Sequence, residues 1–276
     1  MSRVWLITGA SSGFGRALAN AVLAAGGRVA AGARDPARVR ELAGAYPDAC
    51  RPVELDVTVP AHAAAAVVAA RAAFGRIDVL SNVAGYGLLA AVEDVTDAAA
   101  RRNFETNYFG PLRLIQAVLP TMREQGAGHI INMSAVAGFV NYPGFGVYGA
   151  SKFALEGLSE ALRQEVAPFG IRVTLLEPGP FRTDFATRSL DRPPANPVYD
   201  GTVGKFGRLL DSIAEKQPGD PARGAAAVIA AVESADPPFR LPLGPYAVRR
   251  LRQKIVEWTA TAAAAEPTAK ETDFPR

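Results

Sequence analysis

The sequence is poor in the residues that form disulfides and metal sites. Cys50 is the one cysteine among 276 residues, so no internal disulfide can form and the chain suits a reducing compartment. The two histidines, His62 and His129, stand far apart in sequence, and we expect both to be surface or strand-end residues. We therefore predict a cytoplasmic protein with no bound metal.

The chain also lacks long apolar runs and a strong excess of charge. No stretch is long and apolar enough to cross a bilayer, and the first residues lead directly into a strand with no signal-peptide pattern. Lys and Arg number 30 against 27 Asp and Glu, a balance that indicates no basic patch for nucleic acid. We expect neither nucleic acid nor a membrane as a partner. Hydrophobic residues make up 49% of the chain, enough for one α/β core.

Apolar runs alternate with helical patterns along the chain. Strands are predicted at 4–8, 28–33, 51–55, 77–82, 129–134, 171–177 and 239–243. Helices are predicted at 13–25, 36–45, 60–74, 97–124, 147–167 and 221–234. Strands that alternate with helices predict an α/β fold, a doubly wound parallel sheet of about seven strands with helices on both faces.

We expect one domain over residues 1–258 and a frayed, flexible tail over 259–276, where Ala and Pro mix with polar residues. Within the domain, the segment 184–219 is long, irregular and rich in proline. A long loop in a compact domain is usually functional, so we predict a substrate loop or lid there. The basic run 246–254 is interpreted as a solvated helix in preference to a membrane-surface contact.

The most informative motif is a tyrosine and a lysine one helical turn apart, Tyr148 and Lys152. Positions i and i+4 share a helix face, and Ser134 ends an apolar run shortly before them. A free phenol titrates near ~10, and a cation held nearby would lower its pKa toward the neutral range. Taken alone, such a pair is more typical of a surface helix.

A glycine-rich turn follows the first predicted strand. Gly9, Gly13 and Gly15 stand between that strand and a helical stretch, the order of elements that forms a pyrophosphate cradle. Their spacing departs from the G-x-G-x-x-G pattern. A plain tight turn is the alternative, and the position directly after the first strand argues against it.

Taken together, these motifs resemble the short-chain dehydrogenase/reductase family in its compact single-domain form. Six motifs occur in the family's order between Thr8 and Thr183. They are a Thr-Gly-x-x-x-Gly-x-Gly turn, Asn-x-Ala-Gly, a helix asparagine, a serine, Tyr-x-x-x-Lys and a late Pro-Gly. The resemblance implies a Rossmann-like fold and hydride transfer between a nicotinamide cofactor and a carbonyl or alcohol. It also implies a catalytic tetrad: Asn107, Ser134, Tyr148 and Lys152.

The resemblance assigns each of these four residues a role. Ser134 would hold the substrate oxygen toward Tyr148, which would donate a proton to it. Lys152 would bind the nicotinamide ribose and lower the pKa of the tyrosine. Asn107 would support a water that links the lysine to bulk solvent.

Cofactor contacts are implied along the carboxyl ends of the strands. They are expected at Gly9, Ser11, Ser12, Gly13, Phe14, Gly15, Arg34, Asp56, Val57, Asn82, Ala84, Gly85, Tyr148, Lys152, Pro178, Gly179, Phe181 and Thr183. Asp56 can equally cap a turn, and the segment around Pro178 can equally be a proline-rigid loop. Val83 replaces the family's second asparagine, which affects local hydrogen bonding, while Asn82 can still bond the sheet backbone.

The end of the second strand predicts which cofactor is preferred. Enzymes of this fold that prefer NAD place an acid there, whereas here Ala33 stands at that position and Arg34 follows. Alanine leaves room for a 2′-phosphate and a guanidinium suits its charge, so we expect NADP(H) to be favoured over NAD(H). Asp35 on the ribose is the alternative. Ser12 stands where many NADP-binding relatives carry a second basic residue.

These inferences predict an NADPH-dependent reductase of a lipophilic ketone or aldehyde, acting reversibly. Apolar residues in several loops suggest the lipophilic substrate: Tyr86, Leu88, Phe139, Val140, Tyr142, Phe145, Phe185, Tyr199, Phe206, Leu209 and Leu210. The alternatives are an NAD-linked secondary-alcohol dehydrogenase and a dinucleotide sensor without turnover, against which the intact Tyr148 and Lys152 argue. The resemblance also implies a homodimer or homotetramer built on helices 97–124 and 147–167, with leucines at 155, 158 and 162 along the seam.

Overall fold

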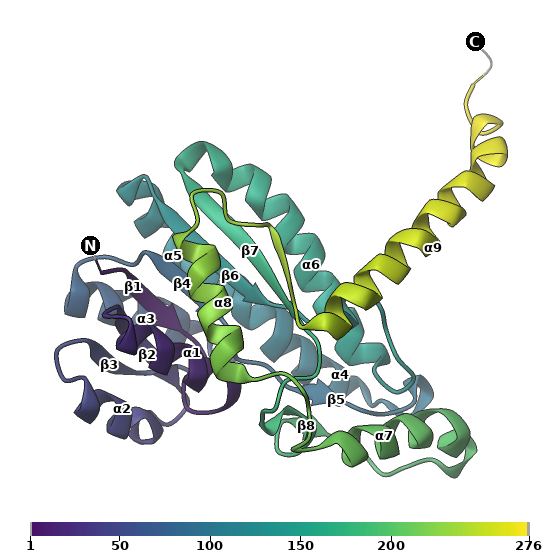
Figure 1. The fold of residues 1–276 in the computed structure, drawn as a ribbon, viewed down its shortest axis with the longest axis horizontal. Coiled ribbons are helices and arrows are strands. Elements are labelled where there is room, and N and C mark those ends of the chain that lie inside the picture. The colour runs from purple at the N-terminus through teal and green to yellow at the C-terminus, as the bar shows by residue number, and fades with distance from the viewer. Residues whose placement is uncertain (1, 275–276) are drawn as a thin grey trace.

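The computed structural model describes residues 2–274, and its centre is a seven-stranded sheet in which every pairing is parallel (Figure 1). The strands are β1 (Val4–Ile7), β2 (Arg28–Ala33), β3 (Cys50–Glu54), β4 (Val79–Asn82), β6 (Gly128–Met133), β7 (Ile171–Pro178) and β9 (Arg240–Leu243). Their order is β3-β2-β1-β4-β6-β7-β9, so the direction of winding reverses between β1 and β4. Ligands of such sheets bind in the crevice at that reversal.

Helices cover both faces of the sheet. On one face α1 (Gly13–Ala24), α2 (Arg40–Ala45) and α8 (Pro221–Glu233) share an apolar core with the sheet. On the other face the core is shared with α3 (Pro60–Phe74), α5 (Gly110–Gln125) and α6 (Gly146–Val166). β1 shows the alternation directly, since Leu6 joins one core and Ile7 the other. The predicted doubly wound, Rossmann-like fold is confirmed.

The helix predicted over 97–124 is interrupted. It consists of α4 (Asp97–Phe104), a π-helical turn over Glu105–Phe109, and α5. Asn107 lies in that turn with its side chain fully buried. π-turns often occur at functional sites, and here the turn carries the predicted site asparagine.

The segment 184–219 is more regular than expected. It contains short turns, the strand β8 (Leu190–Asp191), which pairs with β5 (Gly87–Leu88), and the helix α7 (Lys205–Ile213). The prediction of an irregular loop was wrong because the prolines flank these elements instead of interrupting them. Phe206 and Leu210 on α7 pack against a cluster that includes Phe145 and Tyr148.

The chain end also differs from the frayed tail that was expected. Helix α9 (Pro245–Lys270) runs through most of it and projects away from the body (Figure 1). The run 259–265 is mostly alanine, the strongest helix former, which explains the continuation. Every residue from 255 to 274 is exposed. Whether the tail is flexible stays a prediction, and residues 275 and 276 lie outside the described part of the chain.

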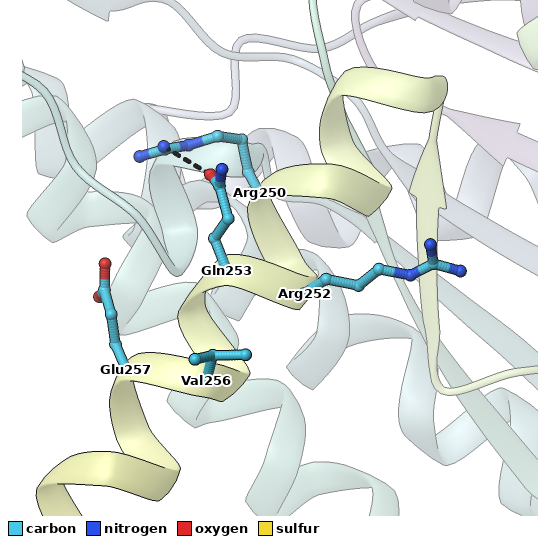
Figure 2. A pocket seen from close by; sticks show the side chains of 5 residues that line it. All are labelled: Arg250, Arg252, Gln253, Val256 and Glu257. Carbon is cyan, nitrogen blue, oxygen red and sulfur yellow. Dashed lines mark hydrogen bonds between the residues drawn. The ribbon is translucent and has the colours of Figure 1, made fainter.

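A shallow hollow lies against α9. Figure 2 shows the five side chains that line it: Arg250, Arg252, Gln253, Val256 and Glu257. Arg250 donates a hydrogen bond to Gln253 Oε1 at 2.9 Å. None of the predicted catalytic or cofactor-binding residues lies in this hollow.

His129 is buried in β6, with 3% of its surface exposed, so it is not a surface residue. Its Nε2 lies 2.9 Å from the Thr174 hydroxyl. Burial lowers the pKa of His129 to about 4, and the charges of Arg172 and Arg3 act in the same direction.

Between residues 2 and 274, none of the helices has the length and apolar character that a membrane crossing requires. In the same range, no three His, Cys, Asp or Glu side chains are grouped so that they could hold a metal ion.

Candidate active site

The predicted site residues gather at the carboxyl ends of the central strands. The glycine turn follows β1, the segment 82–85 ends β4, and Ser134 follows β6. Tyr148 and Lys152 come from the first two turns of α6, and the side chains of both are buried. The parallel sheet thus brings together segments that are more than a hundred residues apart in sequence.

The glycine turn closes on itself so tightly that side chains would not fit. A Cβ on Gly15 would lie 2.8 Å from the carbonyl carbon of Gly9. Gly9 has a φ of 67°, and a Cβ there would lie 3.1 Å from the Cα of Ala84. Thr8 joins the two segments, since its Oγ1 accepts hydrogen bonds from the N–H groups of Val83 and Ala84, both at 2.9 Å. Thr8 was not among the predicted site residues, although it opens the motif.

The start of α1 suits an anion. Its first turn contains no acidic residue, and the Ser12 side chain forms no capping hydrogen bond within residues 2–274. The backbone N–H groups of a first helical turn have no intrahelical partner and carry partial positive charge. This turn therefore has the chemistry of a phosphate site.

The loop after β7 lies against the same turn. The Cβ of Thr183 is 3.6 Å from the point where a Cβ on Gly13 would stand. Phe181 packs edge-on against Phe14, with ring centroids 5.7 Å apart. Upstream, the Gly179 N–H donates to the carbonyl of Leu243 at 3.0 Å, which holds the loop to β9.

Arg34 and Asp56 lie near each other at the ends of β2 and β3. The Asp56 carboxylate accepts hydrogen bonds from the N–H and hydroxyl of Thr58, at 2.9 and 2.7 Å, so it does cap a turn. Partial burial acts to raise the pKa of Asp56, but the Thr58 bonds and the charge of Arg34 outweigh it and lower that pKa. The Asp35 carboxylate accepts from the N–H of Ala37 at 2.9 Å as a helix cap. Arg34 itself is exposed.

Asn82 bonds a side chain, not the sheet backbone as expected. Its Nδ2 donates to Asn132 Oδ1 at 2.9 Å, and Asn132 donates in turn to Ser159 Oγ at 2.9 Å. The reason is the register of β4 and β6, which places Asn132 directly beside Asn82. Val83 packs into the core shared with α1, so the valine that replaces the family's second asparagine serves in packing. Val57 likewise is buried, against Gly110 of α5.

Asn107 organises the backbone next to Gly85. Its Nδ2 donates to the carbonyl of Tyr86 at 2.9 Å, and its Oδ1 accepts from the Tyr86 N–H at 3.1 Å. A Cβ on Gly85 would lie 3.0 Å from Asn107 Oδ1 and 3.5 Å from Lys152 Nζ, so glycine leaves these two groups close to one another. Asn103, one turn earlier, also donates to the Tyr86 carbonyl, at 3.1 Å. Asn103 was not among the predicted site residues, although its i, i+4 spacing to Asn107 could have indicated that the two share a site.

Tyr148 and Lys152 are both buried on α6. Lys152 Nζ donates to the carbonyl of Met133 at 2.8 Å and lies 5.9 Å from the centre of the Tyr148 ring. Burial lowers the pKa of Lys152 to about 8, while the charge of Glu156 acts to raise it. Burial raises the pKa of Tyr148 well above its usual range.

The expected lowering of the tyrosine pKa by the lysine is therefore not observed. The ammonium makes its hydrogen bond to a backbone carbonyl, and the phenol sits among aromatic rings. The ring centroids of Phe145 and Phe185 are 5.0 and 5.5 Å from that of Tyr148. Removal from water favours the uncharged phenol, so Tyr148 holds its proton at neutral pH.

The aromatic wall around Tyr148 includes part of the predicted substrate loop. Phe185 follows Thr183 in that segment, and Phe206 of α7 lies 5.1 Å from Phe145 and stacks on Tyr142 at 5.3 Å. Leu88 belongs to the same cluster. Phe139 and Val140 pack instead with Ala247 at the base of α9, away from this wall.

Comparison with known proteins agrees with this arrangement. The family model for short chain dehydrogenases matches residues 3–193. An oxidoreductase of Botryotinia fuckeliana is 40% identical over 90% of this chain and 91% of its own. A 3-ketodihydrosphingosine reductase of Bacteroides thetaiotaomicron is 37% identical over 93% of each chain. A short-chain dehydrogenase structure from Streptomyces avermitilis is 42% identical, with a TM-score of 0.93 over 99% of this chain and 98% of that one.

The fold and site are those of an oxidoreductase that depends on NAD or NADP. The chain belongs to the short-chain dehydrogenase/reductase family. Similar structures hold either cofactor. One from Burkholderia phymatum, with NAD, is 27% identical at a TM-score of 0.81, over 94% of this chain and 95% of that one. One from Burkholderia cenocepacia, with NADP, is 28% identical at a TM-score of 0.74, over 95% of this chain and 97% of that one.

The residues present fit a dinucleotide. The close-packed glycines leave the backbone of the first turn bare, and Asn82 Oδ1 is buried without a hydrogen-bond partner among residues 2–274. An unpaired buried polar atom beside a bare backbone cradle is typical of a ligand site. When bound, the nicotinamide supplies or accepts the hydride, and the protein supplies orientation and proton transfer.

Proposed function

We propose that this protein is an NADPH-dependent reductase of lipophilic ketones or aldehydes that also runs in reverse as an alcohol dehydrogenase. The observation that carries the proposal is the Tyr148 phenol, buried among aromatic rings beside Lys152 and held in its protonated form. A protonated phenol in an apolar pocket is suited to donate a proton to a carbonyl oxygen.

The four tetrad residues have separate roles in this proposal. Tyr148 donates the proton, and Ser134 orients the substrate oxygen toward it. Lys152 binds the ribose of the cofactor, and Asn107 fixes the backbone at Tyr86 beside the lysine. The remaining cofactor contacts are those of the glycine turn, of Asp56 and Val57, of Asn82 to Gly85, and of the loop from Pro178 to Thr183.

The choice of NADPH rests on Arg34. Its guanidinium is exposed at the end of β2, whereas the neighbouring Asp35 carboxylate is engaged in capping the next turn. A planar guanidinium binds phosphate with two parallel hydrogen bonds, and alanine at 33 leaves space for that group. These contacts favour a 2′-phosphate over a bare ribose hydroxyl.

The lipophilic substrate class rests on the aromatic wall. Phe145 and Phe185 pack against the phenol ring, Phe206 packs on Phe145, and none of the three offers a hydrogen bond to a sugar hydroxyl. The Bacteroides relative is named for the reduction of a 3-keto group, which agrees with a ketone as the substrate. We further propose that the protein is cytoplasmic, since its one cysteine is buried and unpaired.

A titration of the purified protein with NADPH and NADH, followed at the nicotinamide absorbance band, tests this function. Aromatic and aliphatic ketones are then added to the same cuvettes. We expect tighter binding of NADPH and ketone-dependent loss of absorbance. A preference for NADH would favour the alcohol dehydrogenase, and binding without turnover on any carbonyl or alcohol would overturn the proposal.

A further inference from the structure

A cluster of charged side chains, two of them buried, lies next to Ser134 and Lys152. Arg240 of β9 contacts the carboxylates of Glu156 on α6 and Glu177 on β7. It also contacts the half-exposed Glu160 of α6, at 2.6 Å. The side chain of Glu177 is fully buried and that of Glu156 is 7% exposed. Glu177 and Glu156 stand 63 and 84 residues from Arg240 in sequence, so no local motif predicts the cluster.

Glu156 faces the catalytic serine with one oxygen and the cluster with the other. Its Oε2 pairs with Arg240, while its Oε1 has no hydrogen-bond partner among the described residues. The hydroxyl of Ser134 is likewise buried and unpartnered there. Both oxygens lie closer than 3.0 Å to the point where a Cβ on Gly138 would stand. Glycine at 138 is therefore what lets the serine hydroxyl and this carboxyl oxygen occupy one small space.

The surroundings place Glu156 near its titration point at neutral pH. Burial raises its pKa to about 7, and the charge of Glu177 acts in the same direction. The Ser134 hydroxyl and Arg240 act to lower it. The other charged group facing it is Lys152, one turn earlier on α6. With Arg240 shared by several carboxylates, the cluster is short of positive charge, so a proton is readily held there.

We propose that Glu156 is a positioning residue that sets the direction of the Ser134 hydrogen bond, and through it whether the serine can donate to the substrate oxygen. A protonated Glu156 donates to Ser134 Oγ, which leaves the serine hydrogen free to donate to a ketone oxygen. An ionised Glu156 accepts the serine hydrogen, which leaves the substrate oxygen without this donor. The inference rests on the proposed reductase function.

The proposal rests on how many hydrogen bonds the Ser134 hydroxyl can donate. A hydroxyl has a single hydrogen, so Ser134 cannot donate to the carboxylate and to the substrate at once. The substrate oxygen carries the same developing negative charge in the transition state of reduction and of oxidation, so it needs the donor in both directions. The protonation state of one buried carboxyl thus determines whether Ser134 supplies that donor, with the carboxyl proton exchanged with solvent.

The test is the pH profile of kcat in both directions for the wild type, Glu156→Gln and Glu160→Gln. The glutamine amide is a permanent donor toward Ser134. We expect kcat of the wild type, relative to that of E156Q, to fall by about tenfold in both directions as pH rises through 7, the scale of one hydrogen bond to a charged group. E160Q removes a carboxylate from Arg240 without touching Ser134, and it should keep the wild-type profiles.

Two results would overturn the inference: wild-type profiles in E156Q, or equal changes in E156Q and E160Q. If E156Q does not fold, Gly138→Ala serves in its place, since its methyl group separates the two oxygens while both stay present. It should flatten the reduction profile with cofactor affinity unchanged, and a wild-type profile would reject the proposal. A wild type that turns over no carbonyl or alcohol would instead reject the function itself.

Discussion

At the scale of single residues, the environment of Tyr148 decides its chemistry. The pairing of Tyr148 with Lys152 alone suggests a lowered phenol pKa, but burial among Phe145 and Phe185 raises it. Desolvation of the charged form outweighs a cation whose hydrogen bond goes elsewhere. The phenol therefore keeps its proton at neutral pH, as its proposed role of proton donor requires.

Tyr148→Phe removes the proposed proton donor and leaves the ring in place. We expect kcat to fall by about 100-fold to 10,000-fold, the usual contribution of general acid catalysis. The affinity for NADPH, measured by fluorescence titration, should change little because the ring packing is retained. Substantial residual turnover would show that another group donates the proton.

Arg34→Ala removes the guanidinium proposed to bind the 2′-phosphate. We expect NADPH to bind about 10-fold to 100-fold more weakly, since hydrogen bonds to charged groups are worth roughly 1.5–3 kcal/mol. NADH affinity should stay within about twofold. Arg40→Ala, an exposed arginine of α2, is the matched control and should affect neither cofactor. Equal losses for both cofactors in the Arg34 variant would reject the assignment.

His129 makes the fold sensitive to acid. Its pKa is about 4 in the folded protein against 6.5 ordinarily, so between these values the unfolded chain binds more protons. The free energy of unfolding should then decrease as pH falls from about 6.5 to 4, by up to about 3 kcal/mol from this residue. Urea unfolding of His129→Gln should show a shallower decrease over that range. Parallel curves would mean that His129 does not titrate in this way.

At the scale of elements, the helices and strands differ in how much of them a local pattern determines. The seven strands of the main sheet and α1, α3, α6 and α8 were predicted to within one or two residues, because buried apolar runs and terminal proline or glycine mark their ends. The break in 97–124 depends on the bonds of Asn107 to Tyr86, which no local pattern encodes. Helix α7 depends on a docking surface formed by distant residues.

Helix α9 allows a direct test of where the domain ends. From residue 255 onward its side chains are exposed, so they contribute little to the folded core. Deleting 259–276 should leave the melting temperature within about 2 °C and kcat unchanged. Deletion from 245, which removes the buried Ala247, should destabilise the protein clearly. A large loss from the shorter deletion would place the distal helix in a stabilising contact.

At the scale of the whole molecule, we propose a homodimer or homotetramer built on α4, α5 and α6. Phe109, beside the start of α5, and Phe153 of α6 are each 41% exposed, although they are large and apolar. Leu155 and Leu162, expected on the seam, are buried in the core because they face the sheet. The exposed phenylalanines are the better candidates for an interface.

Light scattering after size-exclusion chromatography tests this assembly. We expect the wild type at two or four times the mass of the chain and Phe153→Glu shifted toward the monomer, because a buried unpaired carboxylate disfavours association. Val68→Glu on α3, at an apolar position that is 67% exposed, should leave the assembly unchanged. A monomeric wild type would reject the proposal.

The sequence by itself determined the fold class and the family and singled out the four residues proposed as the tetrad, because these depend on local periodicity and on motifs with fixed spacing. Asn132, Asn103 and the cluster of Glu156, Glu177 and Arg240 became visible only in the tertiary structure. So did the protonation state of Tyr148. Strand register and helix packing bring distant side chains together and exclude water from them. Hydrogen bonding and pKa depend on that exclusion, which a linear pattern does not contain.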